Sequence, residues 1–219
     1  MRASTSVPES LHNSAASPHT RRPPLDPEDY RAARWARRVS GVVGRALKSR
    51  QFAMEPCSAS FHSDAEFAFE SRLSVRASAT ELFWAVADDA REAEWFPGFQ
   101  SVAWLTPAPH GVGSERIYEL DFLRIHERFT VWREGRELTF ELRAMSLPIV
   151  RRFQENYLIT PRADGGADMR WTVAYEPRPS LRRMQPLMHD AFKADFREAA
   201  RGLARMLGAI EPAVTRDRV

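Results

Sequence analysis

Three charged side chains interrupt apolar strand patterns and are the first candidates for chemistry. Arg116, Glu127 and Glu155 each lie two residues from an aromatic side chain in a stretch that alternates apolar and polar residues. Each therefore shares a strand face with apolar neighbours, where an isolated charge costs several kcal/mol. In a functional interpretation, Arg116 holds an acidic or carbonyl ligand head and Glu127 or Glu155 is a general base. In a structural interpretation, the three residues form ion pairs or lie at strand ends.

His189 is the third candidate acid or base, after the two glutamates. It lies on the flank of the apolar stripe of a helix expected at 181–207, where it either donates to a ligand carbonyl or marks the helix boundary. The other five histidines lack metal-ligand spacing, so the sequence predicts no metal site.

Many aromatic and aliphatic side chains share faces with these candidates. They would either line an apolar ligand chamber or fill a core. The candidate lining residues are Tyr118, Leu120, Phe122, Phe129, Phe140, Phe153, Tyr157, Trp171, Tyr175, Met188, Phe192 and Phe196.

The elements that must position these residues follow from the hydropathy pattern. Strict alternation predicts a strand over 67–75, and Ser78 or Thr80 can cap the helix that follows. A second short helix, 91–95, ends before Pro97-Gly98. The last helix, 181–207, is about 38 Å long, enough to cross a sheet. The remaining strands are expected at 99–105, 114–123, 125–133, 137–143, 151–159 and 168–175.

Charge is distributed unevenly along the 219 residues. Residues 1–53 carry ten Lys and Arg against four Asp and Glu, whereas the rest carry 22 against 25. A mildly acidic domain argues against a nucleic-acid partner. With 43% hydrophobic residues the chain can bury a substantial core, and its single cysteine excludes an internal disulfide and fits a cytoplasmic location.

The N-terminal quarter differs from the rest. Residues 1–26 have the composition of a disordered tail, and 27–50 predict a basic amphipathic helix. That helix either contacts an anionic membrane through residues 30–48 or packs on the domain. A third possibility is that translation starts at Met54, in which case the upstream segment is not expressed. A linker over 51–65, a domain over 66–208 and a C-terminal tail over 209–219 complete the expected organisation. The sequence does not indicate an oligomeric state.

Several enzyme classes are disfavoured because their motifs are missing from the sequence. There is no phosphate-binding loop, no dinucleotide fingerprint and no Gly-x-Ser-x-Gly elbow. Cys57 precedes the expected domain, a poor position for a nucleophile. No cofactor is predicted.

The order of elements and four local motifs resemble the START-like superfamily. The motifs are ASATELF at 77–83, EWFPG at 94–98, Gly113 before a strand, and WTVAYEP at 171–177 before the long helix. More narrowly, 66–208 resemble the polyketide cyclase/dehydrase and lipid-transport group, also called SRPBCC proteins. The resemblance implies an α+β helix-grip fold: a curved antiparallel sheet of about seven strands around a long C-terminal helix, with two short helices after the first strand.

The resemblance also implies a ligand class, a hydrophobic or amphipathic molecule such as a lipid, quinone or polyketide, bound between sheet and helix. Three functions stay open. The first is binding or carriage of such a molecule; the second is a cofactor-free cyclase or dehydratase using Glu127, Glu155 or His189. The third is a membrane-associated lipid-handling protein.

Overall fold

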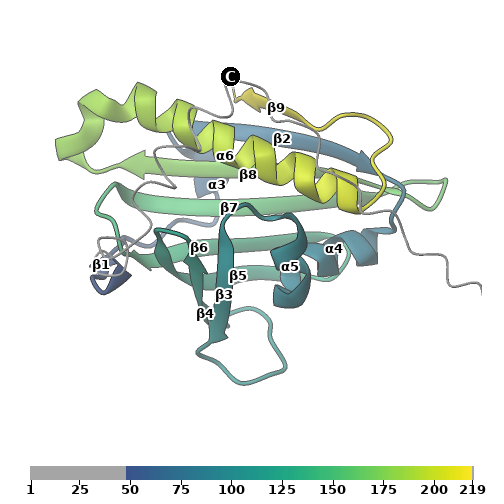
Figure 1. Ribbon diagram of the computed structural model, residues 1–219, viewed down its shortest axis with the longest axis horizontal. Helices are drawn as coiled ribbons and strands as arrows, with labels where there is room; N and C mark the ends of the chain where they lie inside the picture. Colours follow the sequence, from purple (N-terminus) through teal and green to yellow (C-terminus); the bar gives the residue numbers. More distant parts are fainter. Residues whose placement is uncertain (1–47, 219) are drawn as a thin grey trace, which may run out of the picture.

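A long helix lies across one face of a nine-stranded antiparallel sheet (Figure 1). The computed structural model describes residues 48–218, so the predicted tail at 1–26 and nearly all of the predicted helix at 27–50 lie outside the described residues. The strand order is β3-β4-β5-β6-β7-β8-β2-β9, and β1 pairs with β6. The predicted helix-grip fold is confirmed.

The elements follow one another in the predicted order. The strands are β1 (Phe52–Ala53), β2 (Phe67–Val75), β3 (Phe99–Trp104), β4 (Glu115–Leu120), β5 (Arg124–Arg133), β6 (Glu137–Met145), β7 (Val150–Pro161), β8 (Ala167–Pro177) and β9 (Val214–Asp217). The helices are α3 (Phe61–Asp64), α4 (Ala79–Ala87), α5 (Asp89–Trp95), the 3₁₀ helix η1 (Pro179–Met184) and α6 (Gln185–Met206).

Three short elements lie in segments predicted as linker and tail. In the linker segment, β1 pairs with the end of β6, and α3 packs beside β7 and β8. In the tail segment, β9 pairs with β2 at the edge of the sheet. These two strands bring the sheet from about seven strands to nine.

The two short helices begin at side-chain caps. The Ser78 hydroxyl accepts from the Glu81 amide and the Glu81 carboxylate accepts from the Ser78 amide, a reciprocal capping box. The Asp88 carboxylate accepts from the Ala90 amide and so starts α5 directly after α4. Gly98 then turns the chain into β3 with a φ of 73°, a conformation that favours glycine.

The final helix begins later than its hydropathy pattern predicts. Residues 179–184 form a 3₁₀ turn, and the α-helix starts at Gln185 with Pro186 in its first turn, where the missing proline N–H is not needed. Its C-terminal half is buried: Phe196, Ala199 and Leu203 pack into the core. Its N-terminal half is only partly covered.

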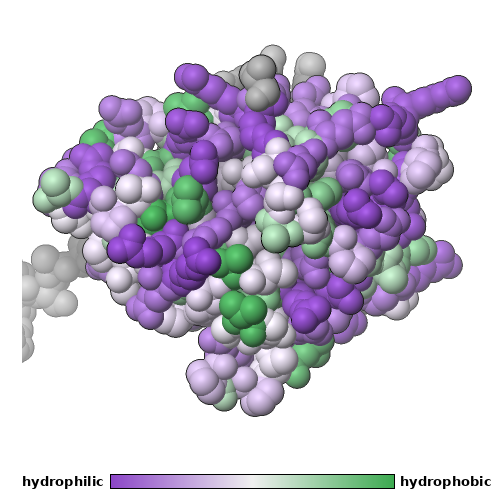
Figure 2. Space-filling model, turned by 180° about the vertical axis from the view of Figure 1, so that it is seen from behind, coloured by the Kyte–Doolittle hydropathy of each residue, from purple (hydrophilic) through white to green (hydrophobic). Residues whose placement is uncertain are grey.

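One main apolar core fills the space between the sheet, α4, α5 and α6. The face of the molecule that points away from the viewer in Figure 1 is mostly hydrophilic, with small separate apolar patches (Figure 2). Within residues 48–218, no helix is both long and apolar enough to cross a membrane.

Candidate functional site

Arg116 lies at the centre of a buried group of ion pairs. Its Nε donates to Glu127 Oε2 at 2.6 Å, and its Nη1 donates to Glu92 Oε2 at 2.8 Å and to Asp89 Oδ1 at 3.0 Å. Its Nη2 also reaches Glu92 Oε1 at 3.2 Å. Arg116 and Glu127 are direct partners on β4 and β5, whereas Glu92 and Asp89 come from α5. These four residues are called the Arg116 cluster below.

Aromatic rings enclose the guanidinium of this cluster. The ring centroids of Trp104, Tyr118 and Phe129 lie 5.5, 5.2 and 5.1 Å from Arg116 Cζ, within the range of cation–π attraction. Trp104 also fixes Asp89, because its indole Nε1 donates to that carboxylate at 2.6 Å. Every nitrogen of the guanidinium thus has a carboxylate partner, which corresponds to the structural interpretation of Arg116 rather than to a ligand anchor.

The Arg116 cluster contains more buried carboxyl groups than cations. Burial raises the pKa of Glu92 to about 8, although Arg116 acts in the opposite direction. Burial also raises the pKa of Glu127, again against the effect of Arg116. One guanidinium cannot neutralise both carboxylates, so the cluster retains a proton at neutral pH.

Glu155 forms a second buried polar group. Its Oε2 accepts from the Tyr157 hydroxyl at 2.7 Å and from Trp171 Nε1 at 2.9 Å. Tyr157 and Trp171 are cross-strand partners on β7 and β8, so the pairing of these strands presents both donors to one carboxyl oxygen. Burial, aided by the nearby charge of Glu127, raises the pKa of Glu155 to about 8, although the hydrogen bonds from Tyr157 and Trp171 act in the opposite direction. The carboxyl is therefore mainly protonated at neutral pH.

Tyr118 carries an unpartnered buried hydroxyl. Its side chain is 3% exposed, and its Oη forms no hydrogen bond with any of the described residues. Burial raises the pKa of this phenol, and the neighbouring charge of Glu92 adds to the increase. The ring packs edge-on against Phe96 and Phe99 at 5.8 and 5.3 Å. A buried hydroxyl without a partner costs about 1–3 kcal/mol, which a bound polar group would recover.

His189 belongs to a different group, at the edge of the sheet. Its Nδ1 lies 3.0 Å from the Tyr175 hydroxyl and its Nε2 lies 2.7 Å from Asp217 Oδ1. Lys193 Nζ donates to the same carboxylate at 2.8 Å. These contacts fasten β9 to α6, while Glu127 and Glu155 lie on inner strands. The structure thus places the three predicted acid or base residues in three separate environments.

The predicted lining residues form a continuous row of rings from β5 to α6. Phe129 contacts Phe140 at 5.6 Å between ring centroids, Phe140 contacts Tyr157 at 6.2 Å, and Tyr157 stacks on Trp171 at 4.9 Å. The row continues to α6, where Phe196 lies 5.2 Å from Trp171. A second row joins Tyr175, Phe192 and Phe153 at 5.2 and 6.2 Å. Three further predicted residues, Leu120, Phe122 and Met188, are partly buried against this core.

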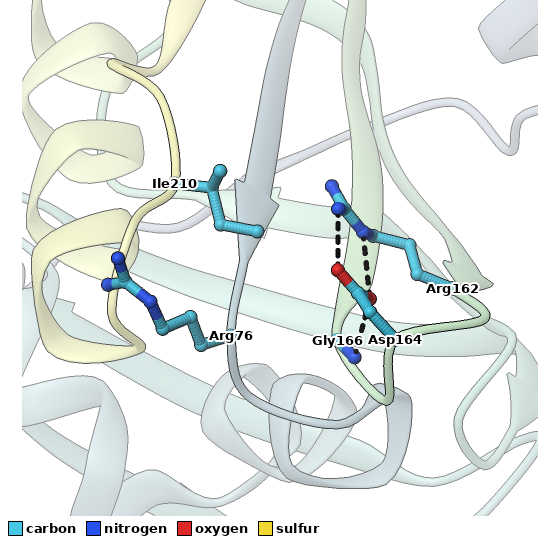
Figure 3. Close-up of a pocket in the computed structure, with 5 residues that line it drawn as sticks. All are labelled: Arg76, Arg162, Asp164, Gly166 and Ile210. Atoms are coloured by element: carbon cyan, nitrogen blue, oxygen red, sulfur yellow. Dashed lines mark hydrogen bonds and ion pairs between the residues drawn. The ribbon is translucent and has the colours of Figure 1, made fainter.

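A pocket of about 380 Å³ lies away from these rings, beside the β7–β8 turn. It is lined by Arg76, Arg162, Asp164, Gly166 and Ile210 (Figure 3). Arg162 Nη2 donates to Asp164 at 2.7 Å, and Figure 3 shows Arg76 directed away from that pair. The two guanidiniums do not converge on one point, so the pocket lacks the geometry of an anion site.

Residues 48–218 contain neither a reactive thiol nor a group of side chains arranged to bind a metal ion. The Cys57 thiol is half-buried, and burial raises its pKa to about 12, which keeps it protonated. In this part of the chain, no group of three His, Cys, Asp or Glu side chains is arranged to bind a metal ion.

The sequence interpretation missed the acidic partners of Arg116. Glu92 and Asp89 were not among the candidates, although Glu92 lies three residues before Trp95 and both are buried on one face of α5. That spacing was the available signal, since residues three apart share a helix face. Trp104, which fixes Asp89, gave no comparable signal, because it is one more aromatic residue on a strand.

Comparison with known proteins supports what the fold indicates. The family model for "Polyketide cyclase / dehydrase and lipid transport" matches residues 66–208. The chain belongs to this family. An uncharacterised protein of Mycobacterium tuberculosis is 28% identical over 156 residues, which are 68% of this chain and 93% of that protein. A protein of the same description from Mycobacterium bovis matches equally well.

Two solved structures were found to be similar to this chain. A START superfamily protein from Mycobacterium smegmatis superposes with a TM-score of 0.55 at 13% identity, covering 64% of this chain and 97% of its own. A Thermobifida fusca protein gives a TM-score of 0.47 at 19% identity, covering 66% and 97%. At such identities the M. smegmatis structure supports the fold alone.

Proposed function

We propose that this family member binds or carries a hydrophobic or amphipathic small molecule between the sheet and α6. An oxygen of the ligand would form a hydrogen bond with the Tyr118 hydroxyl. The ligand class is a lipid, quinone or polyketide-like molecule. The observation that carries the proposal is the unpartnered hydroxyl of Tyr118 inside an interior otherwise rich in aromatic rings. An apolar chamber with a few placed polar groups is the usual form of a small-molecule site.

The ligand's apolar part would lie against the rings of β7, β8 and α6. Phe153, Phe192 and Phe196 meet edge to face or tilted, at centroid distances of 6.2 Å, rather than in one rigid stack. The partly covered Met188 continues this surface outward. Methionine adapts its shape easily, so this part of the interior can rearrange around a guest molecule.

Binding is favoured over catalysis because both candidate carboxylate bases are occupied. Glu127 accepts from Arg116 at 2.6 Å, and Glu155 accepts from two donors while its raised pKa keeps it neutral. A carboxyl group acts as a general base only when it is ionised and lies within reach of the proton that it removes.

A second candidate function is a cofactor-free cyclase or dehydratase. One feature favours it: the Glu155 carboxyl is buried, and because burial raises its pKa to about 8, it can hold a proton at neutral pH and act as a general acid. In the Arg116 cluster, Glu92 also has a pKa of about 8 and is a second buried carboxyl that can hold a proton. In this function the same residues orient a flexible substrate, and Glu155 protonates its leaving oxygen.

Two linked measurements test the proposal. First, the full-length protein is purified, extracted with organic solvent and analysed by mass spectrometry beside a heat-denatured mock preparation. A stoichiometric lipid, quinone or polyketide is expected, and it would name the ligand class.

Second, calorimetry compares decylbenzoquinone with decylbenzene for the wild-type protein and for Tyr118→Phe. We expect the substitution to weaken quinone binding about tenfold, because one hydrogen bond is lost, and to leave decylbenzene unchanged. Failure of the protein to bind either molecule, together with an empty extract, would contradict the proposal. Turnover of a polyketide or ketone substrate that Glu155→Gln abolishes without loss of affinity would favour the enzyme instead.

A further inference from the structure

The start of the last helix exposes large apolar side chains to solvent. Met184, at the end of η1, is 50% exposed, and Leu187, in the first turn of α6, is 68% exposed. They lie three residues apart and therefore on neighbouring positions of one helical turn. Behind them, Met188 and Phe192 are partly buried against the core. Exposed and partly buried apolar side chains thus follow one another along the first turns of α6.

This apolar surface is bordered by positive charge. Residues 177–189 contain Arg178, Arg182 and Arg183 but no aspartate or glutamate. One exposed carboxylate, Asp190, follows directly and lies three residues after Leu187, so the border carries three cations and one anion. Arg182 and Arg183 are exposed, and Arg178 is partly exposed. Arg182 contacts Glu66 at 2.6 Å, but both side chains are at least half exposed, so this pair screens the positive charge only weakly. We call Met184, Leu187, Arg182 and Arg183 the α6-start surface.

The neighbouring loop between β6 and β7 carries two further apolar side chains. Leu147 and Ile149 of this loop are partly buried against the core. The Arg178 amide donates to the Ile149 carbonyl at 3.1 Å, which holds the loop beside the start of η1. Figure 1 shows the loop and the start of α6 at the same end of the molecule.

We propose that the α6-start surface docks this protein on an anionic lipid bilayer. Met184 and Leu187 would enter the boundary between headgroups and acyl chains, and the arginines would lie at the level of the phosphates. Side chains of these two kinds on one short helical segment are typical of interfacial binding, in which buried apolar area and attraction to anionic lipid act together. The inference does not depend on the ligand proposed above, although a ligand leaving the bilayer would meet the apolar surface directly.

Exposed apolar residues elsewhere provide a matched comparison. Val112, in the loop between β3 and β4, is 68% exposed, the same fraction as Leu187. That loop, 105–114, contains no lysine or arginine. Val112 therefore offers apolar area without the charge that would attract anionic lipid.

An environment-sensitive fluorophore at each position tests the proposal in the full-length chain. Cys57, the single cysteine, is replaced by serine, and Leu187→Cys or Val112→Cys is labelled with nitrobenzoxadiazole. Vesicles of phosphatidylcholine are compared with vesicles that also contain phosphatidylglycerol. We expect a several-fold rise in emission with a blue shift at position 187 only with phosphatidylglycerol, reversed by added salt. Position 112 should stay unchanged.

The local probe separates this surface from the basic N-terminal segment. If the protein sediments with anionic vesicles while the probe at 187 stays dark, another segment binds the bilayer and the proposal is wrong. Equal responses at 187 and 112, or no response to any vesicle, would also overturn it. None of these outcomes affects ligand binding measured in vesicle-free solution, so the two proposals can fail separately.

A charge variant supplies the second test. Arg183→Gln should weaken binding to anionic vesicles about fivefold, because each cation near such a surface contributes to the attraction. Arg133→Gln, an exposed arginine at the end of β5, is the matched control and should bind as the wild type does. Equal loss in both variants would show a nonspecific charge effect and contradict docking through the α6-start surface.

Discussion

The residues around Arg116 show how a charge is kept inside an apolar domain. One guanidinium contacts three carboxylates and three aromatic rings, so its hydrogen bonds are met without water. Removing one member of such a group leaves the others buried and uncompensated, which destabilises a protein far more than the net stabilisation of the pair suggests. The Arg116 cluster is therefore expected to dominate the effects of polar substitutions in this domain.

Arg116→Met tests that expectation. Glu92 and Glu127 would lose the cation that they share, so we expect the free energy of unfolding to fall by about 3–5 kcal/mol. Urea unfolding followed by tryptophan fluorescence measures the change. Arg133→Met is the control: its side chain is 71% exposed, and the change should stay within about 0.5 kcal/mol. Similar losses in both variants would show that the buried ion pairs are not special.

At the residue scale the sequence reveals buried charges more readily than their partners. Alternation placed Arg116, Glu127 and Glu155 on inward faces, and all three are buried. The partnership with α5 depends on how that helix packs against β4, and strand periodicity carries no information on such packing. Tyr118 shares the apolar face of its strand and is buried, but only the three-dimensional neighbours of its hydroxyl show that it lacks a partner.

At the scale of elements, α5 and α6 cross at a glycine. A Cβ atom added to Gly202 would lie 2.5 Å from the Trp95 carbonyl oxygen, closer than real Cβ contacts. This close approach brings α6 against the end of α5, the helix that supplies Glu92 and Asp89. The position of the Arg116 cluster therefore depends on a small residue in a different element.

Gly202→Ala should destabilise the domain despite the higher helix propensity of alanine. Alanine in a helix interior normally raises the free energy of unfolding by up to about 1 kcal/mol relative to glycine. Here the overlap with a backbone atom should lower it by about 1–3 kcal/mol, which outweighs that gain. Thermal unfolding measures the difference. Gly111→Ala, where nothing lies within 4 Å of the added Cβ, is the control and should be neutral. A stabilised Gly202→Ala variant would mean that the helices separate easily.

Element prediction succeeded where apolar alternation is long and failed where elements are short. The nine residues of β2 alternate clearly, and their predicted bounds match the structure. In contrast, β9 has four residues with little burial, and β1 has two. These edge strands are held by backbone pairing and by contacts such as His189 with Asp217, which leave no apolar period in the sequence.

Across the whole molecule, the two ends of α6 have different environments. The C-terminal half packs on α5 and the sheet, whereas the N-terminal half meets solvent through Leu187, next to the exposed Met184 of η1. The anchored half fixes the interior that would hold a ligand, and the open half supplies the surface proposed to dock on a bilayer. One continuous helix thus links the two proposals, and each can be tested without the other.

The pH dependence of stability is a further property of the whole molecule. Glu92 and Glu155 have pKa values of about 8 in the folded domain, against an ordinary value of 4.5, because both are buried. Between these values the folded state holds protons that the unfolded chain has released. The contribution of these two groups to the free energy of unfolding is therefore largest below about pH 4.5 and is lost as the pH rises to about 8. Each group lowers the free energy of unfolding by at most about 1.4 kcal/mol per pH unit in this range.

Glu155→Gln isolates the contribution of one carboxyl. Glutamine is neutral at every pH and keeps an oxygen that can accept from Tyr157 and Trp171, so stability at pH 5 should change little. Between pH 5 and 8 its stability should fall less steeply than that of the wild type, by at most about 1.4 kcal/mol per pH unit. Urea unfolding at a series of pH values measures both curves. Glu94→Gln, an exposed position on α5, should follow the wild-type curve. A Glu155→Gln curve parallel to the wild type would mean that Glu155 is ionised in the folded state, and the argument for its use as a general acid would fail with it.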